Sequence, residues 1–488
     1  MRRLGHRAID LLVDRLVSLG EGRVAGRGSA ADFAALVDEP LPRAGLGAEA
    51  SLDAFFQRVA PGMTKLDHPR FFGFIPSASS FYSVLGKLLD AGANPFVGSW
   101  LGGATVASLE LTVLRWIAEA VGYDPAAAGL FTSGGSIANL CALAAARATF
   151  GSRAAHGAAG TARALGGAEA GSAGTPRLPA GYDLRARATI YASEQGHGSF
   201  EKAALLLGYP PSALRRVPVD CRFRMRVDAL ATQIADDRGA GLLPLAVSAN
   251  AGTTNTGSID PLPEIADLCA AQGIWLHVDA AYGGFAAICA EGRRKLAGME
   301  RADSLTLDPH KWLYAPMGTG CVLVRDRAAL ESAFRVSGDY LKDVPRAEVN
   351  FFDRGPEMSR PGRVLAVWTL LRSAGLDAIA EQVEWDLRLA RLAEELLGAV
   401  PELEIVVPAE LSVVTFRSRA RPGETEAARA ARDSAIMERT LASGELMISS
   451  TDLAGRTALR LVVLNHRTTQ DEIRRSVAAI ARAAGTSA

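Results

Sequence analysis

Paired cysteines, an excess of one charge and long apolar runs are all missing from this sequence of 488 residues. The five cysteines stand apart, without a CxxC pair or the spacing of metal ligands, so we expect reduced, buried thiols and no metal site. They are Cys141, Cys221, Cys269, Cys289 and Cys321. Lysine plus arginine and aspartate plus glutamate number 53 each, which leaves no electrostatic reason to expect nucleic acid or an anionic membrane as a partner.

The N-terminus begins with basic residues, as a secretion signal does, but the apolar stretch of such a signal is interrupted. Asp10, Asp14 and Arg15 break it, and the apolar positions between them predict one face of an amphipathic helix instead. Longer uncharged stretches elsewhere contain Gly, Thr, Asn and Ser, so we expect no membrane span. The sequence predicts a soluble, cytoplasmic protein.

The pattern along the chain predicts three regions. Residues 1–82 form a helical segment, and residues 83–367 alternate short apolar runs with helical segments, which favours an α/β domain with a mainly parallel sheet. The expected strands are ATIYAS (188–193), LAVSAN (245–250), WLHVDA (275–280), SLTLD (304–308) and GCVLVRD (320–326). Residues 153–181, rich in Ala and Gly, predict a flexible insertion, and residues 368–488 predict a small α+β domain.

Four segments next to expected strands carry groups that can do chemistry. The turn Ser-Gly-Gly-Ser (133–136) precedes an Ala-rich helix, whose N-terminus can hold an anion. Asp279 ends an apolar strand, Lys311 lies between a histidine and a tryptophan, and His197 lies in a Gly-flanked loop. Each has an ordinary structural alternative: a helix cap, an internal ion pair, a lysine reaching solvent or a hydrogen-bonded histidine. An anion cradle, a carboxylate, an amine and an imidazole at one sheet edge match the phosphate, ring nitrogen, aldehyde and ring face of pyridoxal phosphate (PLP).

From about His68 onward the sequence also resembles a known family. HPRFFGFIPSASS, GSW, FTSGGSxAN, HVDAAY, DPHKW and DYLK stand in the order found in group II PLP-dependent amino-acid decarboxylases, closest to the aromatic-L-amino-acid decarboxylase branch. The resemblance implies PLP fold-type I, the aspartate-aminotransferase-like fold. It also implies a homodimer with active sites at the interface, in which the N-terminal helices embrace the partner.

The resemblance assigns roles to individual residues. Lys311 is similar to the Schiff-base lysine, Asp279 to the partner of the pyridine nitrogen, and His197 to the histidine that stacks on the ring. Tyr340 resembles the tyrosine that protonates the substrate carbon after carbon dioxide leaves. Further cofactor positions are Gly135, Ser136, Thr254, Ala281, Ser304 and His310.

The residues that match the family's substrate pocket are Leu66, Phe74, Ile75, Pro76, Phe96, Gly98 and Ser359. Ser359 suggests a phenolic substrate, whereas the missing side chain at Gly98 suggests room for an indole. We therefore expect decarboxylation of an aromatic L-amino acid such as tyrosine, DOPA, tryptophan or phenylalanine. An apolar aliphatic substrate, an aldehyde synthase or aminotransferase on the same fold, and a catalytically silent dimeric binding protein remain as alternatives.

Asp308 replaces a residue that is often neutral in the family, close to the expected phosphate site.

Overall fold

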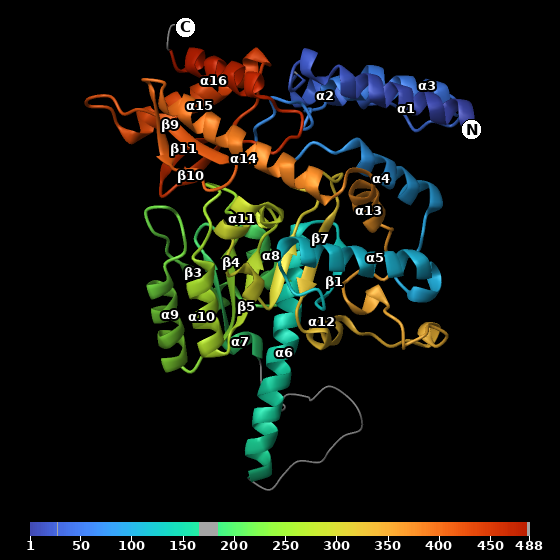
Figure 1. Cartoon of the computed structure of the whole chain (residues 1–488), viewed down its shortest axis with the longest axis vertical. Helices are drawn as coiled ribbons and strands as arrows, with labels where there is room; N and C mark the ends of the chain where they lie inside the picture. Colours follow the sequence, from blue (N-terminus) through green and yellow to red (C-terminus); the bar gives the residue numbers. More distant parts are fainter. Residues whose placement is uncertain (27, 165–183, 486–488) are drawn as a thin grey trace. The chain divides into compact units, whose positions relative to one another are not determined.

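The computed structural model describes residues 1–26, 28–164 and 184–485, without the side chains of residues 151–164, Leu184 and Tyr340 (Figure 1). The chain divides into two compact units. The large unit comprises Ser79–Trp385 with Ala409–Leu411, and the small unit comprises Met1–Ala78, Asp386–Pro408 and Ser412–Ala488. Each unit has its own sheet.

A mainly parallel sheet forms the centre of the large unit. Within the described residues it has seven strands in the order β1-β7-β6-β5-β4-β2-β3, and β7 runs antiparallel to both of its neighbours. Their bounds are β1 (Ala128–Thr132), β2 (Ala188–Ser193), β3 (Leu214–Val217), β4 (Leu243–Asn250), β5 (Trp275–Asp279), β6 (Ser304–Leu307) and β7 (Gly320–Val324). The five expected strands are present to within two residues at each end. The α/β fold prediction is confirmed.

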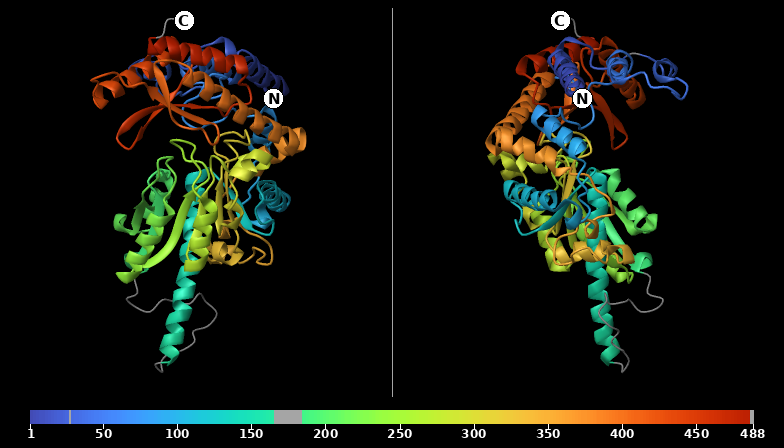
Figure 2. Two further views of the ribbon diagram at one scale, coloured as in Figure 1. Left: turned by 60° about the vertical axis from the view of Figure 1, so that its left-hand side comes forward. Right: turned by 90° about the vertical axis from the view of Figure 1, so that its right-hand side faces the viewer.

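Helices pack on this sheet. Helix α6 contacts β4 to β7 and packs with α8 and α12, while α9 and α10 pack on β3, β4 and β5. The helices are α4 (Phe81–Ala93), α5 (Trp100–Val121), α6 (Gly135–Ala164), α7 (Leu184–Arg187), α8 (Gly198–Leu206), α9 (Val227–Gly239), α10 (Leu262–Gln272), α11 (Ala290–Lys295), α12 (Arg327–Phe334), α13 (Val364–Ala374) and α14 (Leu376–Gly398). In Figure 2, α6 runs well past the end of the sheet. Of the insertion expected at 153–181, residues 153–164 continue α6, and residues 165–181 lie outside the described residues.

Helix α5 is long and apolar enough to cross a membrane by length and composition, with 33% of its apolar window buried. No other helix in residues 1–26, 28–164 and 184–485 meets that test. The buried face of α5 carries Glu110, which forms an ion pair of 2.7 Å with Arg360, and both side chains are fully buried. This pair ties α5 into the interior of the large unit.

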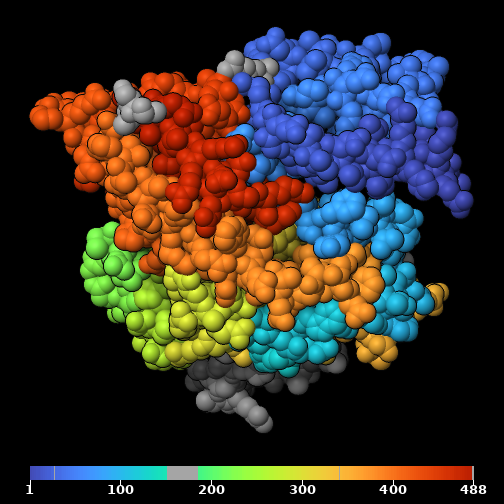
Figure 3. Space-filling model, turned by 45° about the horizontal axis from the view of Figure 1, so that its top comes forward, coloured from blue at the N-terminus to red at the C-terminus, as the bar shows by residue number. Residues whose placement is uncertain are grey.

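The small unit combines both ends of the chain around an antiparallel sheet. Its four described strands run in the order β10-β11-β9-β8: β8 (Leu403–Val407), β9 (Val413–Ser418), β10 (Ser449–Leu453) and β11 (Arg456–Val462). Its helices are α1 (Arg2–Val17), α2 (Ala30–Val37), α3 (Ala48–Ala54), α15 (Glu426–Ser443) and α16 (Gln470–Ala484). In Figure 3 the N-terminal surface, in blue, borders the C-terminal surface, in red.

The unit boundaries differ from the three predicted regions 1–82, 83–367 and 368–488. The N-terminal segment belongs with the C-terminal domain because Phe72 donates its N–H to Met447 O and accepts from Val462 N. The second boundary lies between Trp385 and Asp386, inside α14. A change of composition near residue 368 does not reveal a boundary that falls within one helix.

Candidate active site

The site begins with the alignment of three parallel strands. Asn250 of β4 pairs with Asp279 of β5, and Asp279 pairs with Thr306 of β6, so these residues share the carboxyl edge of the sheet. Two residues earlier, His277 pairs with Ser304. Because side chains alternate along a strand, residues two apart point to the same face, which α6 contacts. Ligands of open α/β sheets bind at this carboxyl edge.

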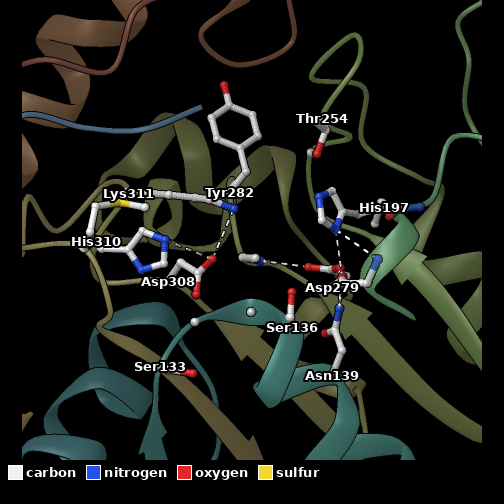
Figure 4. Close-up of a pocket in the computed structure, with 17 residues that line it drawn as sticks. Ser133, Ser136, Asn139, His197, Thr254, Asp279, Tyr282, Asp308, His310 and Lys311 are labelled. Carbon is white, nitrogen blue, oxygen red and sulfur yellow. Dashed lines mark hydrogen bonds and ion pairs between the residues drawn. The ribbon is translucent and has the colours of Figure 1, made fainter. Parts of the chain in front are cut away.

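A cavity of about 410 Å³ opens there (Figure 4). Eight of the predicted cofactor residues line it together: Gly135, Ser136, His197, Thr254, Asp279, Ala281, His310 and Lys311. The other lining residues are Ser133, Gly134, Asn139, Ser199, Asn250, Gly252, Tyr282, Asp308 and Met317. The structure thus gathers one amine, two carboxylates and two imidazoles around a single space.

Lys311 extends into the cavity from the segment that follows β6 (Figure 4). Its Nζ lies 3.1 Å from Asp308 Oδ2, and the lysine side chain is 19% exposed. His310 Nδ1 lies 2.7 Å from the carbonyl of Thr319, which can only accept, so Nδ1 carries the hydrogen. His310 Nε2 then lies 3.6 Å from the same Asp308 oxygen. The lysine is therefore neither exposed at the surface nor packed among apolar groups alone, because it has a buried carboxylate partner.

Asp279 lies on the opposite side of the cavity. Its Oδ2 accepts from Asn139 Nδ2 at 2.9 Å and its Oδ1 accepts from the N–H of Ala281 at 3.2 Å. The side chain is 8% exposed, and both hydrogen bonds come from neutral donors. Together these two donors fix the orientation of the carboxylate. Asp279 is thus arranged as a fixed negative charge that faces a cationic ligand group.

His197 caps the N-terminus of α8. Its Nδ1 accepts from the N–H of Ser199 at 3.2 Å and lies 2.8 Å from the Ser199 hydroxyl. The imidazole is therefore held from one edge, while its ring borders the cavity. This arrangement suits a ring that packs on a planar ligand.

The N-terminus of α6 forms the floor of the cavity. Gly135 begins the helix directly after the Ser-Gly turn, and the first N–H groups of a helix have no intrahelical acceptor. The hydroxyl of Ser136 points into the cavity in Figure 4. Gly320 presses against this turn, because a Cβ there would lie 2.5 Å from the Cα of Gly134. The turn can thus hold a phosphate, as helix N-termini do.

Two predicted site residues are not among those that line the cavity: Ser304, which lies elsewhere, and Tyr340, whose side chain is not among the described ones. Ser304 does not line it: the side chain is fully buried and hydrogen bonds to His277 Nδ1 at 2.9 Å and to Trp275 Nε1 at 2.8 Å. A direct phosphate contact by Ser304 is therefore wrong for this arrangement, because both neighbours already occupy its hydroxyl. Tyr340 lies in the turn Asp339–Leu341, and its side chain is outside the described ones, so its role stays a prediction.

None of the predicted substrate residues lines the cavity. Four of them belong to the small unit: Leu66, Phe74, Ile75 and Pro76. In the large unit, a Cβ on Gly98 would lie 2.1 Å from the carbonyl oxygen of Met358, the residue before Ser359, and 3.0 Å from Phe96. The expectation that Gly98 makes room for an indole is therefore wrong, because backbone fills that space. Gly98 thus lies against Phe96 and Met358, and none of these three residues lines the cavity that holds Lys311.

Sequence reasoning missed two residues that connect the site, Asn139 and Ser199. Asn139 stands in the FTSGGSxAN motif, four residues after Gly135, and so lies on the same face of α6. Helical spacing is the signal that could have identified it. Tyr282, stacked on Trp312 at 5.2 Å between ring centroids, also lines the cavity without having been predicted.

Comparison with known proteins identifies the family of this chain. Residues 32–164 and 175–419 match the family described as the pyridoxal-dependent decarboxylase conserved domain. The chain belongs to this family. It is 35% identical over 477 residues to an aromatic-L-amino-acid decarboxylase of Bacillus atrophaeus, covering 97% of this chain and 93% of the relative.

Other relatives of this pyridoxal-dependent decarboxylase are similar over almost their whole length. The crystal structure of Oryza sativa TDC with PLP and tryptamine superposes with a TM-score of 0.89 at 27% identity, covering 99% of this chain and 97% of that one. A phenylacetaldehyde synthase of Arabidopsis thaliana is 27% identical over 474 residues, 95% of this chain and 91% of the relative. The predictions of a PLP-dependent amino-acid decarboxylase, of its family and of its cofactor are confirmed.

The residues in the cavity fit PLP. When bound, PLP supplies an aldehyde for an amine and a ring that takes up the electron pair released with carbon dioxide. Lys311 would hold the aldehyde, Asp279 the ring nitrogen, His197 the ring face and the N-terminus of α6 the phosphate. The donor set of the cavity therefore supplies one partner for each chemical feature of the cofactor.

Proposed function

We propose that this decarboxylase converts an aromatic L-amino acid to its amine. The observation that carries the proposal is the single cavity in which Lys311 and Asp279 face each other above the N-terminus of α6. The name of the Bacillus atrophaeus relative supports the aromatic class of substrate. An apolar aliphatic amino acid remains the alternative within the same reaction.

Each residue has a distinct task in this proposal. Lys311 would supply the amine that holds the cofactor's aldehyde, and the Asp308 carboxylate pairs with its ammonium while the lysine is unreacted. Asp279 would hold the ring nitrogen of the cofactor through its negative charge. His197 would border the face of the ring and orient the substrate. Tyr340 returns a proton to the substrate carbon.

The proposal is tested by release of carbon dioxide from a panel of L-amino acids with PLP added. We expect turnover of tryptophan, tyrosine, DOPA or phenylalanine well above that of leucine and glutamate. If none of the four aromatic amino acids releases carbon dioxide, the proposal is overturned. If leucine is turned over faster than all four, the substrate belongs to the apolar aliphatic class instead.

Aldehyde formation is the second candidate, because the Arabidopsis thaliana phenylacetaldehyde synthase is also similar to this chain. The tyrosine at position 340 favours the amine, since protonation of the substrate carbon competes with its oxidation. Tyr340→Phe should raise the ratio of aldehyde to amine in the products. An unchanged ratio would contradict the role proposed for Tyr340.

We propose further that two copies form a homodimer in which each completes the other's site. Large apolar side chains are exposed on and near α4, namely Tyr82 (46%), Leu88 (53%), Leu89 (52%) and Leu101 (60%), and patches of this kind mark interfaces. Helices α1, α2 and α3 have no buried side chain among those described. Phe96, Gly98 and Ser359 lie outside the cavity of their own chain, as expected if they serve a second copy.

Light scattering during gel filtration tests the homodimer. Aspartate at both Leu88 and Leu89 should yield monomers with reduced turnover. Aspartate at Leu205 and Leu206, which are exposed on α8, is the matched control and should leave the dimer intact. A wild-type monomer with full activity would contradict the proposal.

We also propose a cytoplasmic location. All five cysteines are free in the described part of the chain, and four of them are buried, as suits a reducing compartment. Cell fractionation should recover the protein in the cytosol. Recovery from the membrane or the medium would contradict the proposal.

A further inference from the structure

Asn139 is a fully buried side chain in the second turn of α6, and all of its hydrogen-bonding capacity is used. Its Nδ2 lies 2.9 Å from Asp279 Oδ2 and 3.0 Å from Ser199 Oγ. Its Oδ1 lies 3.0 Å from His277 Nε2 and 2.6 Å from Thr306 Oγ1. Asn139 therefore joins three strand or helix ends at one point, as the dashed lines of Figure 4 show in part.

The direction of each of these hydrogen bonds follows from the Asp279 carboxylate, which can only accept. Asn139 must present its NH₂ group to Asp279, so its Oδ1 accepts from His277 and Thr306. His277 then carries its hydrogen on Nε2, and its Nδ1 accepts from the Ser304 hydroxyl, whose oxygen accepts from Trp275 Nε1. Burial lowers the pKa of His277 to about 4, with the Asp279 charge opposing the shift, so the ring is neutral at ordinary pH.

The Asn139 amide also determines the hydrogen bonds on the side of His197. Since Asn139 donates to Ser199 Oγ, the Ser199 hydroxyl is free to donate to His197 Nδ1 at 2.8 Å. The N–H of Ser199 donates to the same nitrogen at 3.2 Å. His197 Nδ1 is thus an acceptor for two donors, and the hydrogen of the neutral ring lies on Nε2.

We infer that Asn139 is a positioning residue that joins Asp279 and His197 into one hydrogen-bonded unit. It holds the Asp279 carboxylate in place toward the ring nitrogen of the cofactor. Through the Ser199 hydroxyl it also adds a second donor to His197 Nδ1, which the N–H of Ser199 already holds as an acceptor. This inference rests on the roles proposed for Asp279 and His197.

The decisive test compares Asn139→Asp with Asn139→Leu. In Asn139→Asp, two carboxyl groups face each other at the position of a 2.9 Å hydrogen bond. While they share one proton, the pair keeps one donor and one negative charge, as in the wild type. When that proton is lost, like charges repel and the carboxylate is displaced. Asn139→Leu has no donor at any pH.

The readout is the dissociation constant for PLP, measured by absorbance titration from pH 6 to 8.5 and expressed relative to wild type at each pH. Asp308, His310, Lys311, His197 and His277 are present in both proteins, so the ratio removes the part of the pH dependence that the two proteins share. For Asn139→Asp the ratio should rise about tenfold or more from pH 6 to 8.5. For Asn139→Leu it should be high at every pH. A ratio for Asn139→Asp that does not change with pH, or wild-type affinity in Asn139→Leu, overturns the inference.

Two further variants separate positioning from folding. Asn350→Asp changes another buried asparagine of the large unit, which bonds Pro345 O and Trp100 N away from the cavity, and its ratio should stay near one. Ser199→Ala removes the hydroxyl that links Asn139 to His197 but keeps the N–H that donates to His197 Nδ1, so kcat should fall a few-fold while the affinity for PLP stays close to wild type. A loss of PLP affinity in Ser199→Ala as large as in Asn139→Leu would overturn the two-branch arrangement.

Failure of the proposed function is distinguishable from failure of this inference. If the wild type binds PLP but releases no carbon dioxide from aromatic amino acids, the proposed function fails while the binding ratios still test Asn139. If the wild type decarboxylates and the ratio for Asn139→Asp does not change with pH, only the inference fails.

Discussion

The two sides of the cavity hold their carboxylates in opposite ways. Asp279 ends β5 and Asp308 follows β6, on neighbouring strands, and both are buried, at 8% and 3% exposure. Asp279 is held by the neutral donors Asn139 and Ala281. Asp308 instead faces Lys311 at 3.1 Å, and its Oδ1 has no hydrogen-bond partner among the described residues.

The difference indicates which side changes during the reaction. A network of neutral donors stays intact when a ligand arrives, so Asp279 can serve as a permanent charge. The ion pair of Asp308 must change whenever the lysine reacts, because the ammonium has to give up a proton before its nitrogen can form a new bond. A buried carboxylate without all its partners is costly, and a bound group can relieve that cost. The following predictions test this contrast.

The largest effect should follow Lys311→Ala, which removes the only amine lining the cavity within the described residues. We expect no turnover above background, because neither cofactor nor substrate exchange has a nucleophile. Carbon dioxide release and the absorbance band of the bound cofactor measure this effect. Lys202→Ala, at an exposed lysine on α8, is the control and should behave as wild type. Residual turnover within tenfold of wild type would remove Lys311 from its role.

Asp279→Ala should lower kcat by about two to four decades, since removal of one partner of a buried ion pair costs roughly 3–5 kcal/mol. Asp279→Asn keeps the shape of the side chain without its charge, so its comparison with Asp279→Ala separates the contribution of the charge from that of the shape. Steady-state kinetics on the PLP-saturated variants measures the effect. A variant that retains the kcat of the wild type would show that the Asp279 carboxylate does not contribute to the reaction rate.

Asp308→Asn should tighten PLP binding by about tenfold, because it removes a negative charge beside the expected phosphate site. Asp308 Oδ2 lies 3.1 Å from where a Cβ on Gly135 would be, so the carboxylate borders the N-terminus of α6. Equilibrium dialysis of PLP at pH 7.5 measures the change. Asp353→Asn, another buried aspartate with an oxygen lacking a partner among the described residues, is the matched control. Weaker binding in Asp308→Asn would mean that orientation of Lys311 outweighs repulsion of phosphate.

The smallest effect concerns stability in acid. The pKa of His277 in the folded protein is about 4, below the ordinary 6.5, so its contribution is complete above pH 6.5 and is lost as the pH falls through 4. Asp260 acts in the opposite sense, because burial raises its pKa to about 6 and its contribution is lost as the pH rises from about 4 through 6. Wild type should lose about 1 to 2 kcal/mol more of its free energy of unfolding than His277→Gln between pH 6.5 and 5, measured by urea unfolding. Equal losses would show that His277 is not held neutral.

Much of the fold was predictable because it depends on local patterns. Apolar runs bounded by turns mark the buried strands β2, β4, β5, β6 and β7, whereas β3 (LRRV) is missed because two arginines interrupt it. The link from Phe72 to Met447 joins residues 375 apart, and no local pattern reports such a contact.

The site followed the same rule. Position and residue type predicted the turn 133–136, His197, Asp279 and Lys311, and the family resemblance added Thr254, Ala281 and His310. All of these line one cavity. Asn139 was missed because only its helical spacing from Gly135 marks it, and an uncharged amide by itself does not point to any chemistry. The error at Gly98 has the same origin, since a missing side chain suggests space only until the carbonyl of Met358 is found there.

Because the small unit is made of segments far apart in the sequence, the order of synthesis affects when it can fold. Its N-terminal part, Met1–Ala78, pairs through Phe72 with Met447 and Val462. Phe72 therefore leaves the ribosome long before Met447 and Val462, and its backbone can complete these hydrogen bonds only after those residues have been made. All seven described strands of the large unit are made in between, so that sheet can form while this part of the small unit still lacks its partners.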